Sequence, residues 1–316
     1  RDPEMSRGLG DVYKRQGEVV ANDSVDLSVK HGEILSVLGE NGSGKTTLMN
    51  MISGIYFPDE GQIFVDGEEV SICSPKDSFA LGIGMIHQHF KLVDVLTAAE
   101  NIILGLEGKS VLDMKKVVQD IQEVTERYGF ELDPNQKIYD MSVSQKQTVE
   151  IVKMLYRGAN ILILDEPTAV LTPQETEKLF TVLRNMRDQG KSIIIITHKL
   201  NEVLALSDRV SVLRKGKYIG TVETKNATAE SLTEMMVGEK IDLNIERPDP
   251  VNPVKRLVIE NLSCVNKEGV KTLKNASMEA YGGEILGIAG IAGSGQKELL
   301  EAVAGLQMTE SGSVRY

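Results

Sequence analysis

The chain has 316 residues, 41% hydrophobic and 26% charged, the balance of an ordinary globular protein with room for one full domain and part of another. The net charge of −11 argues against non-specific binding to nucleic acid, which requires a basic surface. The two cysteines, Cys73 and Cys264, make neither a metal-ligand spacing nor a disulfide framework, which suits a reducing compartment. No apolar run approaches the ~18 residues that cross a bilayer, so any membrane role must be peripheral.

The first sixteen residues show no hydrophobic periodicity, and Asp11–Gln16 matches a translated transposon-end sequencing adaptor. We interpret 1–16 as a non-native leader and exclude it from the predicted fold. Native sequence is then expected from about Gly17, with the first strand of its domain missing.

A phosphate-binding loop is predicted at Gly39-Glu-Asn-Gly-Ser-Gly-Lys-Thr46, which fits the pattern G-x-x-x-x-G-K-[ST]. It follows an apolar strand, Ile34–Leu38, and opens a helix, as the motif requires. Lys45 would contact the β- and γ-phosphates, and the Thr46 hydroxyl would ligate magnesium. The predicted nucleotide-binding residues of this loop are Gly39, Asn41, Gly42, Ser43, Gly44, Lys45, Thr46 and Thr47.

Gln88 follows a short strand and precedes a helical region at about 91–156. In that region Val117, Ile121, Val124 and Tyr128 form an apolar stripe typical of core packing. The Gln88 amide could reach both magnesium and water. Within that region Ser142 and Gln145 form a capping box at the start of an apolar-periodic helix. A capped helix N-terminus is also an anion site, which could face a phosphate bound to another domain.

Two buried strands end in polar residues that suit nucleotide hydrolysis. Ile161–Leu164 is followed by Asp165, a predicted magnesium ligand, and by Glu166, which would orient or deprotonate the attacking water. Ser192–Ile196 leads to His198, which could sense the γ-phosphate. Between these strands Thr172 is predicted to cap a helix that ends at Gly190.

An internal repeat relates the two ends of the chain. Gly32-Glu-Ile-Leu35 recurs as Gly283-Glu-Ile-Leu286, and Gly42-Ser-Gly44 falls on Gly293-Ser-Gly295 at the same offset. The predicted organisation is therefore a first α/β domain at 17–240, a proline-rich linker at 241–255, and the start of a second copy at 256–316 with a strand at Leu257–Leu262. We expect that second copy to be cut off at Tyr316.

These elements in this order resemble the ABC transporter ATPases, a class of P-loop NTPase whose α/β nucleotide-binding domain carries a helical subdomain. The resemblance runs from about Gly17 to Tyr316. It equates Gly39–Thr46 with Walker A, Gln88 with the Q-loop, and Met141–Gln145 with the signature. Ile161–Glu166 then matches Walker B, Ala169–Thr172 the D-loop and His198 the switch histidine. The stretches Gly82–Phe90 and Glu166–Gln174, together with the tandem repeat, resemble the monosaccharide and nucleoside importers, the purine-nucleoside branch above all.

The resemblance implies ATP and Mg²⁺ as ligands, transmembrane permease subunits as partners, an extracytoplasmic receptor lipoprotein, and peripheral attachment to the cytoplasmic face of the membrane. It also implies two ATP sites, each joining the P-loop of one domain to the signature of the other, so Ser142, Ser144 and Gln145 would contact nucleotide held elsewhere. Ser144 stands where the signature usually has glycine, and Gln296 stands where the second P-loop should have lysine. Both departures fall in one composite site, so we expect hydrolysis at the Lys45 site and a structural role for the other. Because the second signature and the usual adenine-stacking aromatic residue are expected to be missing, weak nucleotide binding and slow turnover are predicted.

Three alternatives remain open at this level. A tandem translation factor or a DNA-repair clamp would keep the ATPase without a permease, but the long charged linker or coiled coil of those proteins is not seen here. A P-loop small-molecule kinase would need no signature and no repeat. A binding protein without hydrolysis would not need Glu166 or His198.

Overall fold

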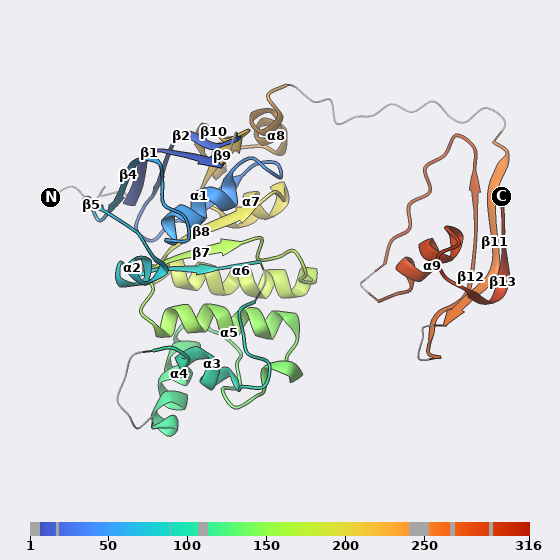
Figure 1. Cartoon of the computed structure of the whole chain (residues 1–316), viewed down its shortest axis with the longest axis horizontal. Helices are drawn as coiled ribbons and strands as arrows, with labels where there is room; N and C mark the ends of the chain where they lie inside the picture. Colours follow the sequence, from blue (N-terminus) through green and yellow to red (C-terminus); the bar gives the residue numbers. More distant parts are fainter. Residues whose placement is uncertain are drawn as a thin grey trace. The chain divides into compact units, whose positions relative to one another are not determined.

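The computed structural model describes residues 7–16, 19–88, 90–106, 113–239, 253–265, 269–290 and 293–316 (Figure 1). It divides into two compact units, Arg1–Ile241 and Asp242–Tyr316. The expected linker at 241–255 lies largely outside the described residues. In the described ranges no helix combines the length and the apolar composition that crossing a membrane requires.

The described part of the first unit is built on a sheet in the order β5-β4-β1-β2-β10-β9-β3-β8-β7-β6. The strands β9, β3, β8, β7 and β6 are mutually parallel, whereas β1, β2, β4 and β5 pair antiparallel. The strands are β1 Arg7–Gln16, β2 Val19–Val29, β3 Ile34–Leu38, β4 Glu60–Val65, β5 Glu68–Val70, β6 Ile83–Ile86, β7 Ile161–Asp165, β8 Ser192–Thr197, β9 Arg209–Arg214 and β10 Lys217–Glu223.

Helices follow most of the parallel strands. They are α1 Lys45–Ile52, α2 Pro75–Ala80, α3 Ala98–Ile103, α4 Met114–Tyr128, α5 Val143–Tyr156, α6 Pro173–Asp188, α7 Leu200–Leu206 and α8 Ala229–Val237, with 3₁₀ turns η1 Ile138–Asp140 and η2 Thr224–Asn226. The capping boxes predicted at Ser142 and Thr172 are confirmed, each with its reciprocal pair of hydrogen bonds.

The alternation of side chains along β3 distributes the core between the two faces of the sheet. Leu35 and Val37 pack in one cluster with α1, while Ile34 packs on the other face with α6. Strands buried on both faces are expected to be continuously apolar, and all five residues of β3 are buried. This double burial fixes the strand ends rigidly, and the polar residues after them are therefore held in place.

The helical region predicted at 91–156 is confirmed. Helices α3, α4 and α5 share a separate apolar cluster that includes Val117 and Ile121 of the predicted stripe. Tyr128, the last residue of α4, packs instead in the cluster of α5 and α6, so it joins the helical region to the core of the sheet.

The expectation that the first strand of the domain is missing is wrong in the structure. Arg7–Gln16 forms β1, which pairs antiparallel with β2 on one side and with β4 on the other. The segment has no amphipathic pattern of its own, and its strand conformation follows from backbone pairing with these two neighbours. Residues 1–6 of the predicted leader lie outside the described residues.

The second unit repeats the opening of the first at the predicted offset. In its described part β11 (Lys255–Val265) lies between β12 (Lys271–Tyr281) and β13 (Thr309–Arg315), as β1 lies between β2 and β4, and one helix, α9 (Gln296–Val303), follows. The left-handed glycines also recur: φ is 80° at Gly42 and 82° at Gly293, and 95° at Gly44 and 90° at Gly295. The repeat therefore extends from sequence to backbone conformation.

One element of the repeat is not formed. The offset predicts a counterpart of β3 at 285–289, but these residues form no strand, and Ile285 is 73% exposed. In the first unit β3 is paired on both sides, with β8 and β9. The described part of the second unit contains no strand equivalent to either, so the apolar segment has no ladder to join.

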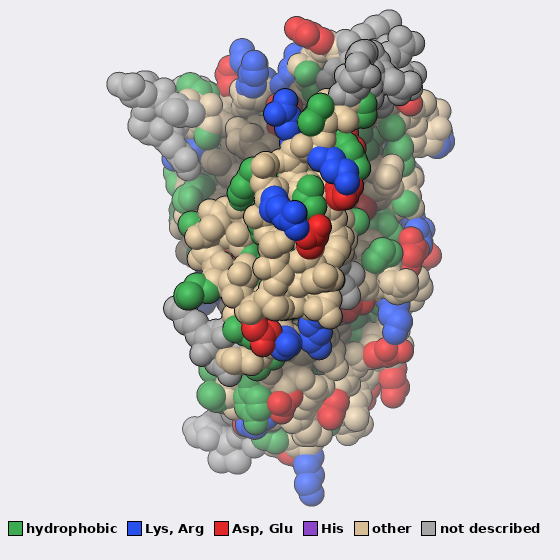
Figure 2. All heavy atoms as spheres, turned by 90° about the vertical axis from the view of Figure 1, so that its right-hand side faces the viewer, with side chains coloured by type: hydrophobic (Ala, Val, Ile, Leu, Met, Phe, Trp, Pro, Cys, Tyr) green, Lys and Arg blue, Asp and Glu red, His purple; other side chains and the backbone are tan. Residues whose placement is uncertain are grey.

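Charges of both signs are mixed on the surface. On the face drawn in Figure 2, lysine and arginine side chains are interspersed with acidic ones, and the described residues there make no continuous basic surface.

Candidate functional site

Four neighbouring parallel strands end at the same edge of the sheet, and each is followed by a predicted site residue. The loop at 39–44 follows β3, His198 follows β8, Asp165 and Glu166 come at the end of β7, and Gln88 follows β6. The strand order β3-β8-β7-β6 makes these four segments adjacent, although more than one hundred and fifty residues separate them in sequence. Ligands of open α/β sheets bind at this edge.

The loop after β3 has the tight geometry of a phosphate cradle. A Cβ at Gly39 would collide with the Leu213 carbonyl, and one at Gly44 would collide with the Ala21 carbonyl, so neither position tolerates a side chain. At Gly42, whose φ is 80°, an added Cβ would meet nothing within 4 Å. That side of the loop is therefore open, and successive backbone amides there can bind an anion.

Lys45 is the first residue of α1 and is 6% exposed. Its ammonium group donates to the carbonyls of Gly39 at 2.7 Å and Glu40 at 2.8 Å, which folds the side chain back over the loop. Burial lowers the pKa of Lys45, and the carboxylates of Glu166, Asp165 and Glu40 oppose that shift. The carbonyl groups of the loop therefore hold the Lys45 side chain in place.

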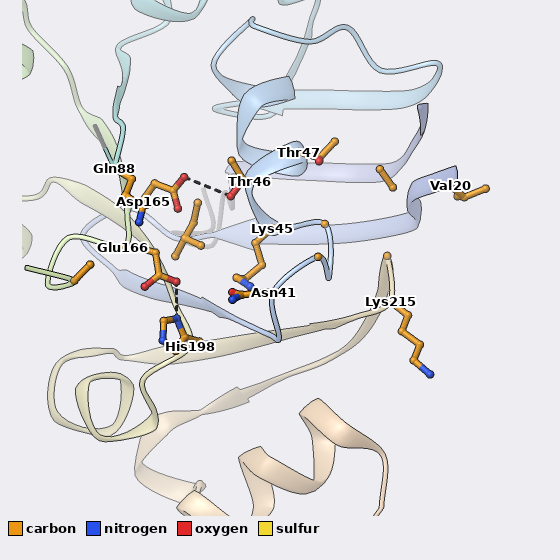
Figure 3. Close-up of a pocket in the computed structure, with 16 residues that line it drawn as sticks. Val20, Asn41, Lys45, Thr46, Thr47, Gln88, Asp165, Glu166, His198 and Lys215 are labelled. Atoms are coloured by element: carbon orange, nitrogen blue, oxygen red, sulfur yellow. Dashed lines mark hydrogen bonds and ion pairs between the residues drawn. The ribbon is translucent and has the colours of Figure 1, made fainter. Parts of the chain in front are cut away.

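Asp165 lies opposite the start of α1. The Thr46 hydroxyl donates to its Oδ2 at 3.4 Å (Figure 3). Burial, and then the neighbouring Glu166 carboxylate, raise the pKa of Asp165, while the Thr46 hydroxyl and the Lys45 ammonium lower it. The hydroxyl and the carboxylate together present hard oxygen ligands, the kind that Mg²⁺ prefers.

Glu166 and His198 face each other from adjacent strand ends. The Nδ1 atom of His198 lies 2.8 Å from Oε1 of Glu166 (Figure 3). Glu166 has φ of 49°, which is uncommon for a residue other than glycine and costs on the order of 1–3 kcal/mol unless surrounding contacts hold it. A strained, partly buried carboxylate beside a histidine is an arrangement suited to positioning a water molecule.

These residues share one pocket of about 800 Å³. From the predicted set it is lined by Asn41, Gly42, Gly44, Lys45, Thr46, Thr47, Gln88, Asp165, Glu166 and His198. Gly39 and Ser43 of the predicted set do not line the pocket; both are buried, and Ser43 is 3% exposed.

The pocket also has a wall that the sequence did not indicate. It is formed by Val20 and Ala21 of β2 and by Lys215 and Gly216 of the β9–β10 turn (Figure 3). These residues belong to no motif, and backbone contacts of β2 with β10 and with the turn before it bring them together. Hydrophobic periodicity could have located the strands but not this pairing.

The predicted signature residues are not part of this pocket. Ser142 is the N-cap of α5, and Ser144 and Gln145 line a different hollow, between α5 and α6. Gln145 accepts from the Ser142 amide at 2.9 Å, which is the local capping role.

The second P-loop-like segment repeats the first with altered chemistry. Gln296 is the first residue of α9, as Lys45 is of α1, and its Nε2 atom donates to the Ile288 carbonyl at 3.1 Å. Lys297 points elsewhere, since its side chain is 79% exposed and pairs with Glu301 at 3.7 Å. The position that holds an ammonium group in the first unit holds a neutral amide in the second.

Comparison with known proteins points to one family. Residues 22–169 match the family model described as ABC transporter. The chain is 49% identical over 307 residues to the nucleoside import ATP-binding protein NupA of Lactococcus lactis, covering 96% of this chain and 61% of that protein. It is 48% identical over 298 residues to the guanosine import ATP-binding protein NupO of Bacillus subtilis, covering 94% and 58%. The chain thus spans about 60% of the length of these relatives.

Solved structures agree on the fold. The ADP conformation of MJ1267, an ATP-binding cassette of an ABC transporter, aligns with a TM-score of 0.66 at 25% identity over 74% of this chain and 100% of that one. CbiO1 of Clostridium perfringens, part of the ABC transporter complex cbiONQ, aligns with a TM-score of 0.64 at 27% identity over 74% and 95%.

Proposed function

The first unit of this chain is a P-loop nucleotide-binding domain of the ABC type, and on that premise we propose that the chain is the ATP-binding and ATP-hydrolysing subunit that energises an importer of nucleosides or simple sugars. The observation that carries the proposal is the convergence at one sheet edge of a glycine loop and its buried Lys45 with the carboxylates of Asp165 and Glu166 and the imidazole of His198.

In this proposal the loop and Lys45 bind the triphosphate. The loop is open at Gly42. The backbone N–H groups at the start of α1 would bind phosphate there, where the helix dipole favours negative charge. Lys45 adds a positive charge for the β- and γ-phosphates. Because Lys45 already rests on two loop carbonyls, little conformational freedom is lost when an anion binds.

Magnesium fits the oxygen atoms of the same pocket. Thr46 and Asp165 would hold it, with the Gln88 amide at the pocket wall as a further ligand. When bound, Mg²⁺ offsets charge on the phosphates. In the described part of the chain no three His, Cys, Asp or Glu side chains gather as a metal site.

Glu166 is the proposed base or orienting group for the attacking water. The Nδ1 atom of His198 lies 2.8 Å from this carboxylate and would help to hold it. In this proposal the imidazole contacts the γ-phosphate. Ser142, Ser144 and Gln145 would act on nucleotide bound to another ABC domain, since they lie outside the Lys45 pocket.

The transported substrate and the partners follow from the relatives. NupA and NupO are named for nucleoside and guanosine import, and a Haloferax volcanii relative, 43% identical over 338 residues, for glucose import. We assign this chain to the same substrate classes, with transmembrane permease subunits as direct partners and a receptor lipoprotein as an indirect one. The chain would attach peripherally to the cytoplasmic face of the membrane.

Glu166→Gln tests the proposed hydrolysis. The amide keeps the size of the side chain but cannot accept a proton, so kcat for ATP should fall by about 100-fold or more, while the Kd for a non-hydrolysable ATP analogue stays unchanged. Glu177→Gln, at an exposed position on α6, is the matched control and should hydrolyse ATP like the wild type. Wild-type turnover in Glu166→Gln would contradict the assigned role.

A further inference from the structure

The turn that follows β7, Glu166–Thr168, is held by a hydrogen bond at each of its three residues. The Glu166 amide donates to the Ile196 carbonyl of β8 at 2.9 Å. The Pro167 carbonyl accepts from Gln147 Nε2 at 2.8 Å, and the Thr168 carbonyl accepts from Lys199 Nζ at 2.9 Å. Each anchor comes from a different element: β8, α5, and the N-cap of α7.

The Lys199 anchor is the more extensive. Besides the carbonyl, its ammonium group donates to the Thr168 hydroxyl at 3.1 Å and to Glu202 Oε1 at 2.9 Å. The Thr168 hydroxyl in turn donates to Glu202 Oε2, and Thr168 is 2% exposed. The three side chains therefore form a closed network under the turn.

The Gln147 anchor reaches the same turn from α5. Gln147 is 5% exposed, and its bond to Pro167 is buried. An amide in that setting has few alternative partners, so the bond fixes the distance between α5 and the end of β7.

A turn held in this way explains how Glu166 keeps its unusual backbone. A φ of 49° persists only where neighbouring contacts determine it, and the hydrogen bonds at Glu166, Pro167 and Thr168 supply such contacts. His198 and Lys199 are adjacent in sequence, so the residue that contacts the Glu166 side chain is next to the residue that holds the following turn.

We propose that Lys199 and Gln147 are positioning residues for Glu166: they hold the turn Glu166–Thr168 so that the carboxylate keeps its place between the P-loop and His198. The inference rests on the proposed hydrolysis of ATP, and neither residue lines the Lys45 pocket. Losing either anchor should therefore impair turnover and leave nucleotide binding intact.

The test uses Lys199→Met and Gln147→Met in the intact protein. Each should lower kcat for ATP about 10- to 100-fold, the cost of a small misplacement of a reacting group, with KM and the Kd for a non-hydrolysable ATP analogue unchanged. Lys199→Arg, which keeps the charge and the donors, should recover most of the loss. Lys178→Met and Gln119→Met, at exposed positions, are the matched controls and should behave like the wild type.

Hydrogen–deuterium exchange on the same proteins reports on the turn independently of hydrolysis. Peptides covering 165–170 should exchange faster in Lys199→Met and Gln147→Met, whereas peptides covering α1 should not change. Wild-type exchange in this segment, or a joint fall of kcat, analogue affinity and Tm, would overturn the proposal. If the wild type hydrolyses no ATP, the proposed function fails while the exchange result still decides whether the turn is held as described.

Discussion

The surroundings of Asp165 disfavour its charged form, and this bears on its proposed role as a magnesium ligand. Burial and the adjacent Glu166 carboxylate raise the pKa of Asp165. A raised pKa means that folding favours the neutral form relative to the unfolded chain. The charged form therefore lowers stability above the folded-state pKa, and this penalty is lost as the pH falls through that pKa. A cation bound beside the carboxylate would remove the penalty, which is how a buried acid becomes a metal ligand.

Replacing Asp165 with asparagine should separate stability from binding. At neutral pH the nucleotide-free Asp165→Asn variant should have a Tm at or above that of the wild type, and the difference should vanish at acidic pH where Asp165 is protonated. The Mg²⁺-dependent part of ATP-analogue affinity should be lost in the variant. In the wild type, the Mg²⁺-dependent part of the affinity should decline on acidification, starting at a pH above the range in which an aspartate usually titrates. Thermal melts and titrations with and without Mg²⁺ measure both, and a variant that keeps the full Mg²⁺ effect would exclude Asp165 as a ligand.

Single site residues could be predicted where they belong to one continuous motif or directly follow an apolar strand. Gly39 to Thr47 could be placed because the P-loop encodes its own turn and helix start. Asp165, Glu166 and His198 followed from strand ends. Val20 and Lys215 were not predictable, since the pocket wall depends on which distant strands pair. Lys199 was not predicted for the same reason, because its hydrogen bonds to the turn after β7 form only in the folded chain.

At the scale of elements, local signals worked best. The capping boxes at Ser142 and Thr172 involve residues three apart, so sequence alone specifies them. Strand β1 shows the opposite case. Its sequence has no strand pattern, and its conformation depends on pairing with β2 and with β4, which lies more than forty residues away.

The two capping boxes allow a matched comparison. Ser142→Ala and Thr172→Ala should each lower the free energy of unfolding by ~1 kcal/mol, because each removes one reciprocal cap. If the start of α5 also contacts nucleotide on another ABC domain, Ser142→Ala should in addition reduce ATP turnover in the intact protein, while Thr172→Ala should not. Denaturant unfolding and ATPase rates measure both quantities. Equal turnover in the two variants would remove the proposed signature role.

At the scale of the whole chain, the internal repeat was predicted by an unchanged offset of glycines, and the backbone angles follow it. Comparing the sequences of the two copies did not predict that 285–289 would form no strand. Strand formation there depends on pairing partners rather than on the segment's own sequence. The expected functional asymmetry rests on two departures: Ser144 in place of the usual signature glycine, and an amide at Gln296 in place of the ammonium group of Lys45.

Equilibrium titration with a non-hydrolysable ATP analogue and Mg²⁺ tests the central claim most directly. The account predicts one bound nucleotide per chain, an affinity that falls about 10- to 100-fold in Lys45→Met because a charged hydrogen-bond donor to phosphate is lost, and no change in Gln296→Met. Wild-type affinity in Lys45→Met, or binding that disappears only in Gln296→Met, would contradict it.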